Sequence, residues 1–296
     1  MNDQRPWAEQ IAPAKVNLFL HIVGQRPDGY HEIESLFAFT DFGDRLRARW
    51  ASHLNLTIDG PFAARLAELT PEGEEHNIVL KAAHRLREAA GQSELGAEIT
   101  LTKNLPVAAG IGGGSSDAAA ALRLLSDIWR LDCPASDLAE IALGLGADVP
   151  ACLHSRPCLV SGIGERIVPY SGLPHTPCLL VNPGHSVPTP QVFSGFRESR
   201  QDFSDPIAPK LGATPRQLLQ QTRNDLEPAA KEILPVIADV LQELAGIEGC
   251  LLSRMSGSGA TCFGLFESVD QAQTASTALA RRHPDWWCQA GRLSSS

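Results

Sequence analysis

The sequence lacks the marks of a membrane-spanning, disulfide-bonded or nucleic-acid-binding protein. No stretch approaches the roughly 18 apolar residues of a transmembrane helix, and the opening residues, MNDQRPWAEQ, contain no apolar segment of the kind that signal peptides carry. The seven cysteines form no CxxC pair and no metal-ligand spacing, which favours free thiols in a reducing cytoplasm. A net charge of −9 argues against the basic face that sequence-independent nucleic-acid binding requires. We therefore expect a cytoplasmic protein that has neither a membrane nor a nucleic acid as its partner.

What is present is a chain long enough to bury a large core. With 296 residues and 43% hydrophobic content, it forms one large domain or two of ordinary size. We place a boundary between about residues 155 and 185 and divide the chain into residues 1–165 and 166–296. The acidic balance does not exclude an anionic small substrate, because a few local donors can outweigh it.

Hydrophobic periodicity predicts a mixed α and β fold. AKVNLFLHIV alternates and predicts a strand with Lys15 and Asn17 on the same face, where both could line a pocket. A second strand is predicted from the alternation in AEITLTK. Short strands joined by turns are predicted from SRPCLVSGIGERIVPY, and a loop or a domain crossing from the proline-rich NPGHSVPTPQVF. Helical spacing predicts helices with the following caps: Asn77, Ser136 or Asp137, Thr214, and Ser268 in a capping box with Gln271.

The stretch NLPVAAGIGGGSSDAAAAL, residues 104–122, predicts a phosphate-binding loop. Glycines directly before a helix leave backbone N–H groups free to bind an anion, and the helix N-terminus adds its positive dipole end. The loop is not a Walker A motif, because Gly114 is followed by Ser115 and Ser116 rather than by lysine, and it does not match GxGxxG. The alternative is a tight turn that binds nothing.

Two charged residues are candidates for chemistry, although their spacing alone leaves the matter open. Asp148, in GLGADVP, lies where an aspartate is more often a turn residue or a cap than a catalyst. Lys15 lies at the start of an apolar strand, where a charge without a partner is costly. A surface lysine at the end of a strand is the simpler alternative for Lys15.

Three motifs together resemble those of the GHMP kinases, the superfamily of galactokinase, homoserine kinase and mevalonate kinase. They are the glycine-rich loop, PAKVNLFLHIVGQRPDGYHEIESLF near the N-terminus, and MSGSGATCFGLF near the C-terminus. The N-terminal motif, with LGADVP and PTPQVF, is similar to the branch that phosphorylates a cytidine-diphosphate-linked methylerythritol in the non-mevalonate isoprenoid pathway. The sequence departs from the family at Ala108, often glycine, and at Ile111, usually leucine, and little is recognisable between Arg197 and Pro215.

The resemblance implies both a fold and a reaction. The fold is the two-domain α/β (α+β) architecture of GHMP kinases, with an N-terminal domain like domain 2 of ribosomal protein S5 and a ferredoxin-like C-terminal domain. The reaction transfers the γ-phosphoryl group of ATP, accompanied by Mg²⁺, to the 2-hydroxyl of the methylerythritol. By this resemblance, Asp148 accepts the proton of that hydroxyl, and Lys15 pairs with Asp148 and with the developing charge.

The resemblance also implies which residues bind the two substrates. The alcohol substrate, with its cytidine, would contact Asn17, Tyr30, His31, Thr189, Pro190 and Phe193. The ATP phosphates would be held by Gly110, Ile111, Gly112, Gly113, Gly114, Ser115 and Ser116, with Lys103, Pro106 and Ala109 beside them. Ser116 is the hydroxyl expected near Mg²⁺.

Three other functions stay open at this point. The chain could be a GHMP kinase for another small alcohol, such as homoserine or mevalonate, a nucleotide-binding protein without kinase activity, or a structural protein. The presence of both Lys15 and Asp148 argues against the second, and the third leaves the phosphate loop unexplained. We expect a monomer or a homodimer whose partner is a small molecule carrying a cytidine diphosphate group.

Overall fold

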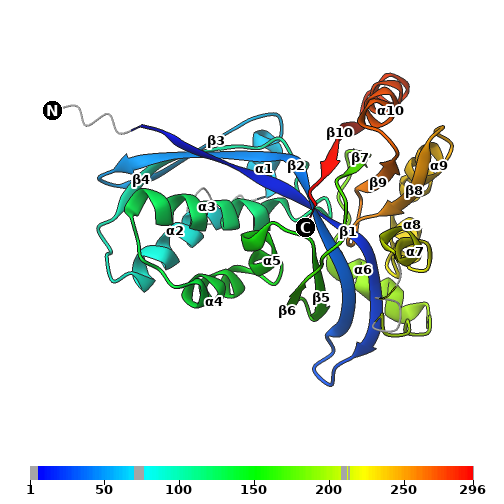
Figure 1. Ribbon diagram of the computed structural model, residues 1–296, viewed down its shortest axis with the longest axis horizontal. Coiled ribbons are helices and arrows are strands. Elements are labelled where there is room, and N and C mark those ends of the chain that lie inside the picture. The colour runs from blue at the N-terminus through cyan, green and yellow to red at the C-terminus, as the bar shows by residue number, and fades with distance from the viewer. Residues whose placement is uncertain (1–5, 70–76, 208–211, 213, 296) are drawn as a thin grey trace. The chain divides into compact units, whose positions relative to one another are not determined.

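The computed structural model describes residues 6–69, 77–207, 212 and 214–295, which form a mixture of helices and strands (Figure 1). The strands are β1 (Ala8–Gln25), β2 (His31–Ala51), β3 (Leu54–Asp59), β4 (Gly96–Thr102), β5 (Cys158–Gly162), β6 (Arg166–Pro169), β7 (Thr176–Asn182), β8 (Cys250–Met255), β9 (Cys262–Phe266) and β10 (Trp287–Leu293). The helices are α1 (Ala63–Leu69), α2 (Ile78–Ala89), α3 (Gly113–Trp129), α4 (Ala135–Leu145), α5 (Val149–His154), α6 (Thr189–Glu198), α7 (Pro215–Gln220), α8 (Glu227–Ile233), α9 (Val236–Ala245) and α10 (Val269–Arg282).

By its internal contacts the chain forms two compact units, each of which is discontinuous in sequence. The first unit comprises Met1–Ala14, Phe42–Val107 and Gly112–Ser155, and the second comprises Lys15–Asp41, Ala108–Ile111 and Arg156–Ser296. Strands β1 and β2 therefore each run through both units. The glycine-rich loop passes from the second unit to the first between Ile111 and Gly112. A two-domain division at residues 165 and 166 stays a prediction.

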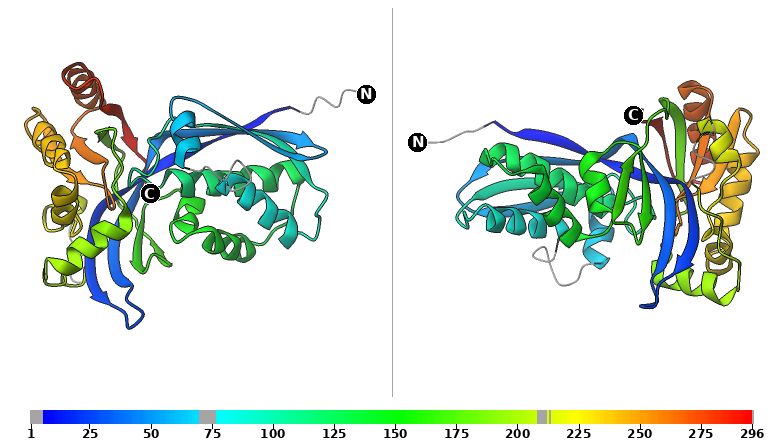
Figure 2. Two further views of the ribbon diagram at one scale, coloured as in Figure 1. Left: turned by 180° about the vertical axis from the view of Figure 1, so that it is seen from behind. Right: turned by 60° about the horizontal axis from the view of Figure 1, so that its bottom comes forward.

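In the first unit a sheet packs against helices on one face. Strand β3 lies parallel to β4, and β4 lies antiparallel to the later part of β2. On β2, Leu46 and Ala48 are buried whereas Arg45 and Arg47 are exposed, so that only one face of the sheet is covered. Helices α2 and α3 lie along that face and pack against each other (Figure 2).

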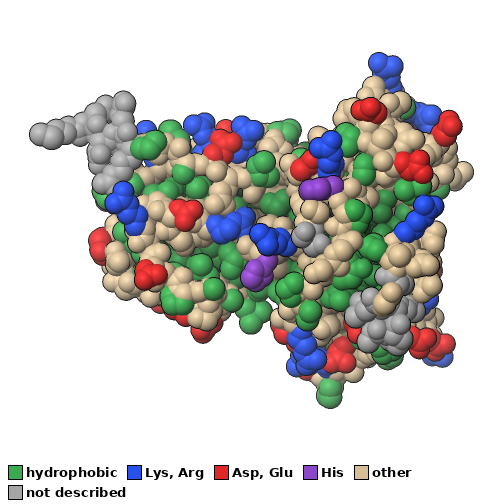
Figure 3. Space-filling view, in the orientation of Figure 1, with side chains coloured by type: hydrophobic (Ala, Val, Ile, Leu, Met, Phe, Trp, Pro, Cys, Tyr) green, Lys and Arg blue, Asp and Glu red, His purple; other side chains and the backbone are tan. Residues whose placement is uncertain are grey.

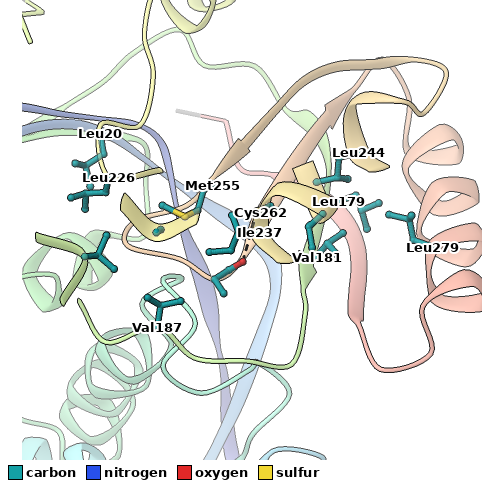
Figure 4. Close-up of a cluster of buried hydrophobic side chains, with 14 of the residues drawn as sticks. Leu20, Leu179, Val181, Val187, Leu226, Ile237, Leu244, Met255, Cys262 and Leu279 are labelled. Carbon is teal, nitrogen blue, oxygen red and sulfur yellow. Dashed lines mark hydrogen bonds between the residues drawn. The ribbon is translucent and has the colours of Figure 1, made fainter. Parts of the chain in front are cut away.

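The second unit contains an antiparallel sheet in the order β10-β7-β9-β8. Counted along the chain from β7, this order is 4-1-3-2, with helices between the first and second and between the third and fourth strands, which is a ferredoxin-like arrangement. Helices α9 and α10 pack on the sheet. Figure 4 shows apolar side chains between these elements, among them Leu179, Val181, Leu244 and Leu279.

Strand β1 confirms the strand predicted from AKVNLFLHIV, and both of its faces are covered. Val16 and Leu18 are buried on one face, and Lys15, Asn17 and Phe19 are buried on the other. The sequence pattern alone suggested one apolar and one more polar face. Because the second face is also covered, Lys15 and Asn17 need hydrogen-bond partners inside the protein.

Three of the predicted helix caps are confirmed. The Asn77 side chain accepts a hydrogen bond from a backbone N–H in the first turn of α2. Thr214 with Gln217, and Ser268 with Gln271, form reciprocal capping boxes at the starts of α7 and α10.

Two local predictions are wrong. Helix α4 begins at Ala135 after Pro134, and no side chain in the described chain caps it, so that neither Ser136 nor Asp137 is the cap. The fixed φ of proline suits the entry to a helix without help from a side chain. The predicted loop of residues 182–193 ends in a helix, because α6 begins at Thr189 and tolerates a proline in its first turn.

The state of the cysteines and the character of the helices agree with what the amino-acid composition predicts. All seven cysteines are free thiols. Among the described helices, none combines the length and the apolar character needed to cross a membrane. Over the face drawn in Figure 3, basic and acidic side chains are interspersed.

Candidate active site

The glycine-rich loop ends at the uncapped start of helix α3. Gly110 and Gly112 have positive φ angles of 75° and 61°, and Ala108 shares this conformation with a φ of 52°. Gly112 is the N-cap residue, and no side chain among the described residues caps the helix. The first backbone N–H groups of α3 are therefore not used by a capping side chain, and together with the helix dipole they suit a phosphate. The predicted ATP residues from Gly113 to Ser116 lie in this first turn.

In the second unit, the earlier part of the glycine-rich loop is anchored by its apolar residues and by a second glycine-serine loop, residues 256–261 between β8 and β9. Ala109 and Ile111 are buried, and the Ile111 carbonyl accepts a hydrogen bond of 2.9 Å from the Lys15 N–H. Ser256 Oγ donates to the Gly110 carbonyl at 3.0 Å. A Cβ on Gly110 would lie 2.6 Å from the carbonyl oxygen of Ser256, so only glycine fits this approach. The predicted Pro106 is buried at the start of the loop.

Lys103 belongs to a buried cluster of three charges beside the start of α3. Its Nζ donates to Asp44 Oδ2 and, at 2.7 Å, to Asp117 Oδ2. The other oxygen of Asp44 accepts the N–H groups of Asn104 and Leu105 at 2.6 and 2.8 Å. A Cβ on Gly113 would lie 3.6 Å from Lys103 Nζ, so the cluster lies directly next to the start of α3. A role for Lys103 in ATP binding stays a prediction.

The charges of this cluster do not balance. Two carboxylates face one ammonium, and all three groups are buried. Burial raises the pKa of Asp117 to about 7, with the Asp44 carboxylate adding to the effect and the Lys103 ammonium opposing it. Asp117 Oδ1 has no hydrogen-bond partner within the described chain.

Asp148 precedes the short helix α5 in the first unit. It occupies the N-cap position, but its carboxylate makes no capping bond to α5 among the described residues. Helix α5 is held against α3 at two points. Ser116 Oγ donates to Cys152 Sγ at 3.4 Å, and Arg123 donates to the Cys152 and Leu153 carbonyls at 2.9 and 2.8 Å. The hydroxyl predicted to lie near Mg²⁺ thus also joins the helix that carries Asp148.

In the second unit, Lys15 and Asn17 form one hydrogen-bonded group, which confirms that they share a face of the strand. Lys15 Nζ donates to Asn17 Oδ1 at 2.8 Å and lies 4.4 Å from the centre of the Phe37 ring. Asn17 Nδ2 donates to Ser35 Oγ at 2.9 Å, and the Asn17 backbone N–H donates to Ser256 Oγ at 3.1 Å. A lysine that is only 4% exposed is not the surface residue that the simpler alternative assumed.

The predicted aromatic residues differ in their surroundings. Tyr30 is 64% exposed, so it is not a core residue. Phe193 packs against the core cluster with one side and stacks on His31 with its ring, at a centroid distance of 5.4 Å and an interplanar angle of 27°. Partial burial, and then the charge of Arg197, lower the pKa of His31, so the neutral imidazole predominates at neutral pH.

Helix α6 brings the remaining predicted substrate residues to the second glycine-serine loop. Thr189 and Pro190 form the first turn of α6, one turn before Phe193. Thr189 Oγ1 and Ser258 Oγ are hydrogen-bonded at 2.8 Å. The structure therefore brings Thr189, Pro190, Phe193 and His31 together within the second unit.

Family models match in both parts of the chain. The description "GHMP kinases N terminal domain" matches residues 77–156, and "GHMP kinases C terminal" matches residues 210–285. The chain belongs to the GHMP kinases. It is a small-molecule kinase that uses ATP, which excludes a purely structural role.

Comparison with individual proteins shows which kinds of GHMP kinase this chain resembles. A 4-diphosphocytidyl-2-C-methyl-D-erythritol kinase of Chelativorans sp. (strain BNC1) is 51% identical over 97% of this chain and 97% of its own. A crystal structure of a 4-(cytidine 5'-diphospho)-2C-methyl-D-erythritol kinase is 35% identical, with a TM-score of 0.80 over 98% of this chain and 100% of its own. A homoserine kinase from Cytophaga hutchinsonii is 20% identical, with a TM-score of 0.73 over 100% of this chain and 96% of its own, and shares the fold. The expected GHMP architecture is thus confirmed.

Proposed function

We propose that this GHMP kinase phosphorylates the 2-hydroxyl of 4-diphosphocytidyl-2-C-methyl-D-erythritol in the non-mevalonate pathway to isoprenoid precursors. The observation that carries the proposal is the similarity, along nearly the whole chain, to relatives named as kinases of this compound. The second unit supports it independently. It holds an exposed tyrosine and a stacked His31–Phe193 pair, which are suitable partners for a nucleobase.

In the proposed mechanism the protein orients the reactants and neutralises charge. The backbone of the glycine-rich loop and the start of α3 hold the ATP phosphates, which need donors and a positive dipole rather than covalent chemistry. Asp148 accepts the proton of the attacking hydroxyl. Lys15, fixed by Asn17 on β1, supplies positive charge that stabilises the negative charge developing on the transferred phosphoryl group.

Substrate selection is assigned to the second unit. Tyr30 and Phe193 contact the cytosine, and His31 presents a neutral imidazole whose orientation is set by its contacts with Phe193 and Phe196. Asn17, Thr189 and Pro190 complete the contacts. We assign the alcohol to the face of β1 that carries Asn17.

Mg²⁺ is part of the proposal and fits the chain as a companion of ATP. Among the described residues there is no group of three or more His, Cys, Asp or Glu side chains that could hold a metal by itself. Mg²⁺ commonly keeps several waters and binds through substrate phosphates with few protein ligands. Ser116 Oγ, which donates its proton to Cys152, retains lone pairs that could face such an ion. When bound with ATP, the ion would neutralise phosphate charge.

The test is a competition between alcohol substrates. Purified protein is supplied with ATP and Mg²⁺, and ADP release is coupled to a spectrophotometric signal with the cytidine-linked alcohol, homoserine or mevalonate. We expect turnover with the first alone and weak competitive inhibition by CMP. Turnover with homoserine or mevalonate, together with no inhibition by CMP, would leave a GHMP kinase of another specificity.

Two further expectations belong to this proposal. The seven free thiols support a reducing, cytoplasmic location. A monomer or a homodimer is expected, and sedimentation of the purified chain decides between them.

A further inference from the structure

The segment between helices α7 and α8 is tied closely to strand β1, and the sequence motifs gave it no role. The Leu20 N–H donates to the Arg223 carbonyl at 3.0 Å, and the Asp225 N–H donates to the Leu20 carbonyl at 2.8 Å. Figure 4 shows Leu20 and Leu226 together at one end of the buried cluster, with Met255 beside them. The segment therefore has a fixed position relative to β1, which also carries Lys15 and Asn17.

Asn224, the central residue of this segment, uses its whole side chain inside the protein. It is 3% exposed. Its Nδ2 donates to the carbonyls of Met255 and Gly257, both at 2.8 Å, and its Oδ1 accepts the Leu226 N–H at 3.0 Å. Both amide protons thus hold the backbone on either side of Ser256.

Ser256, held in this way, joins two parts of the candidate site. Its hydroxyl accepts the Asn17 N–H at 3.1 Å and donates to the Gly110 carbonyl at 3.0 Å. The fit is close, because a Cβ on Gly257 would lie 2.9 Å from the Gly110 oxygen and 3.3 Å from Asn17 Oδ1. A small displacement of residues 255–257 would therefore move Gly110, or break its hydrogen bond to Ser256.

We infer that Asn224 is a positioning residue, which sets the phosphate-binding loop by holding residues 255–257 so that Ser256 bridges Asn17 and Gly110. Asparagine suits this role because it offers two donors and one acceptor in one plane. Aspartate has the same shape but only acceptors when ionised, so it would repel the carbonyl oxygens of Met255 and Gly257. Serine keeps one donor on a shorter side chain. The inference rests on the proposed function only in its use of the alcohol substrate, since ATP use follows from the family.

The competing explanation is that Asn224 merely stabilises the fold, and the adjacent residue provides a matched control. Asp225 is also buried and holds the same segment, accepting from the Ile22 N–H at 2.7 Å, from Ser204 Oγ at 2.7 Å and from Arg223 Nε at 2.6 Å. Among the described residues, these side-chain hydrogen bonds reach β1 and neighbouring loops rather than residues 255–257. The substitution D225N therefore weakens the segment without removing a contact to the second glycine-serine loop.

The experiment compares N224D, N224S and D225N in the full chain by melting temperature, by calorimetric affinity for a non-hydrolysable ATP analogue, and by kcat and KM. For N224D we expect a rise of roughly 5- to 30-fold in the dissociation constant of the analogue and in the KM for ATP, with a smaller rise for N224S, because hydrogen bonds that place Gly110 are lost. D225N should lower the melting temperature but leave nucleotide affinity within about two-fold of wild type.

The outcomes separate the two explanations. Equal nucleotide affinities in N224S, N224D and wild type would overturn the inference, as would an equal loss of affinity in D225N at the same loss of melting temperature. If N224D does not fold, N224S against D225N decides in the same way. If the wild type binds the analogue but does not phosphorylate the cytidine-linked alcohol, the proposed function fails while the binding comparison still tests Asn224.

Discussion

The buried charge cluster predicts an unusual dependence of stability on pH, which the substitution Asp117→Asn should remove. In the folded protein, burial raises the pKa of Asp117 from 3.8 to about 7. A carboxyl whose pKa is raised by folding binds its proton more tightly in the folded state. Its contribution to stability is therefore largest below about pH 4 and is lost as the pH rises through about 7.

The magnitude follows from the two pKa values. Between about pH 6 and pH 8.5 this single group should lower the free energy of unfolding of the wild type by roughly 1.4 kcal/mol, at about 1.36 kcal/mol for each pKa unit. Asparagine has no such titration. Its amide would still accept a hydrogen bond from Lys103 on one side, but on the other side the amide N–H would replace an oxygen that lacks a partner within the described chain. Apart from the titration, D117N should therefore add a pH-independent loss of stability of about 1–3 kcal/mol, so the absolute value is not the test.

The assay is denaturant unfolding of wild type and D117N at about pH 6 and pH 8.5, and the quantity compared is the change between the two pH values. We expect the wild type to lose about 1.4 kcal/mol more than D117N. The matched control is D127N on the same helix, which removes an exposed carboxylate and should keep the wild-type change. Equal changes in wild type and D117N would refute the argument that Asp117 carries the uncompensated buried charge.

The remaining predictions concern the candidate site. D148N should keep ATP affinity but lower kcat by about 10²–10⁴-fold, because an amide cannot accept the proton; near-normal turnover would remove Asp148 from the mechanism. G110A should weaken ATP binding measured by calorimetry, because the new Cβ would lie 2.6 Å from a carbonyl oxygen, whereas G91A, also at a positive φ but in open space, should leave ATP affinity unchanged. Y30A should raise the KM for the cytidine-linked alcohol by roughly 5- to 150-fold without changing the melting temperature, whereas F193A should change both. A melting temperature lowered by Y30A, or an unchanged KM, would contradict the assignment of Tyr30 to the nucleobase.

Part of this structure could be predicted from the sequence because it depends on residues that are close together in the chain. The alternation in β1, the cap at Asn77 and the capping box at Ser268 each depend on residues within a few positions of one another, and all are present in the structure. The glycine-rich loop could be recognised for the same reason. The start of α4 was missed because a proline can begin a helix without a side-chain cap.

Long-range contacts explain most of what the sequence did not reveal. Asp44 lies 59 residues before Lys103, and Ser256 lies 239 residues after Asn17, so no spacing rule could pair them. No sequence pattern marks Asn224. Its inferred role follows only from the structure, in which its two amide donors reach the carbonyls of Met255 and Gly257. The sequence does contain a signal for Asp117. It directly follows Ser116 in the first turns of a helix, and an acidic side chain next to a predicted phosphate loop calls for a nearby cation.

The interleaving of the two units along the chain sets an order for their formation during synthesis. Every residue of the first unit has been made once Ser155 leaves the ribosome, whereas Lys15–Asp41 must wait for strands that follow Arg156. The apolar hairpin of β1 and β2 is thus made early and receives β5 and β10 late. We expect the nascent chain to carry this hairpin without its neighbour β5 for about the first half of translation and without β10 until nearly the end, as a surface for chaperones. A gene truncated just before Trp287 would remove the strand that pairs with both β7 and β2, while leaving the first unit with all of its residues.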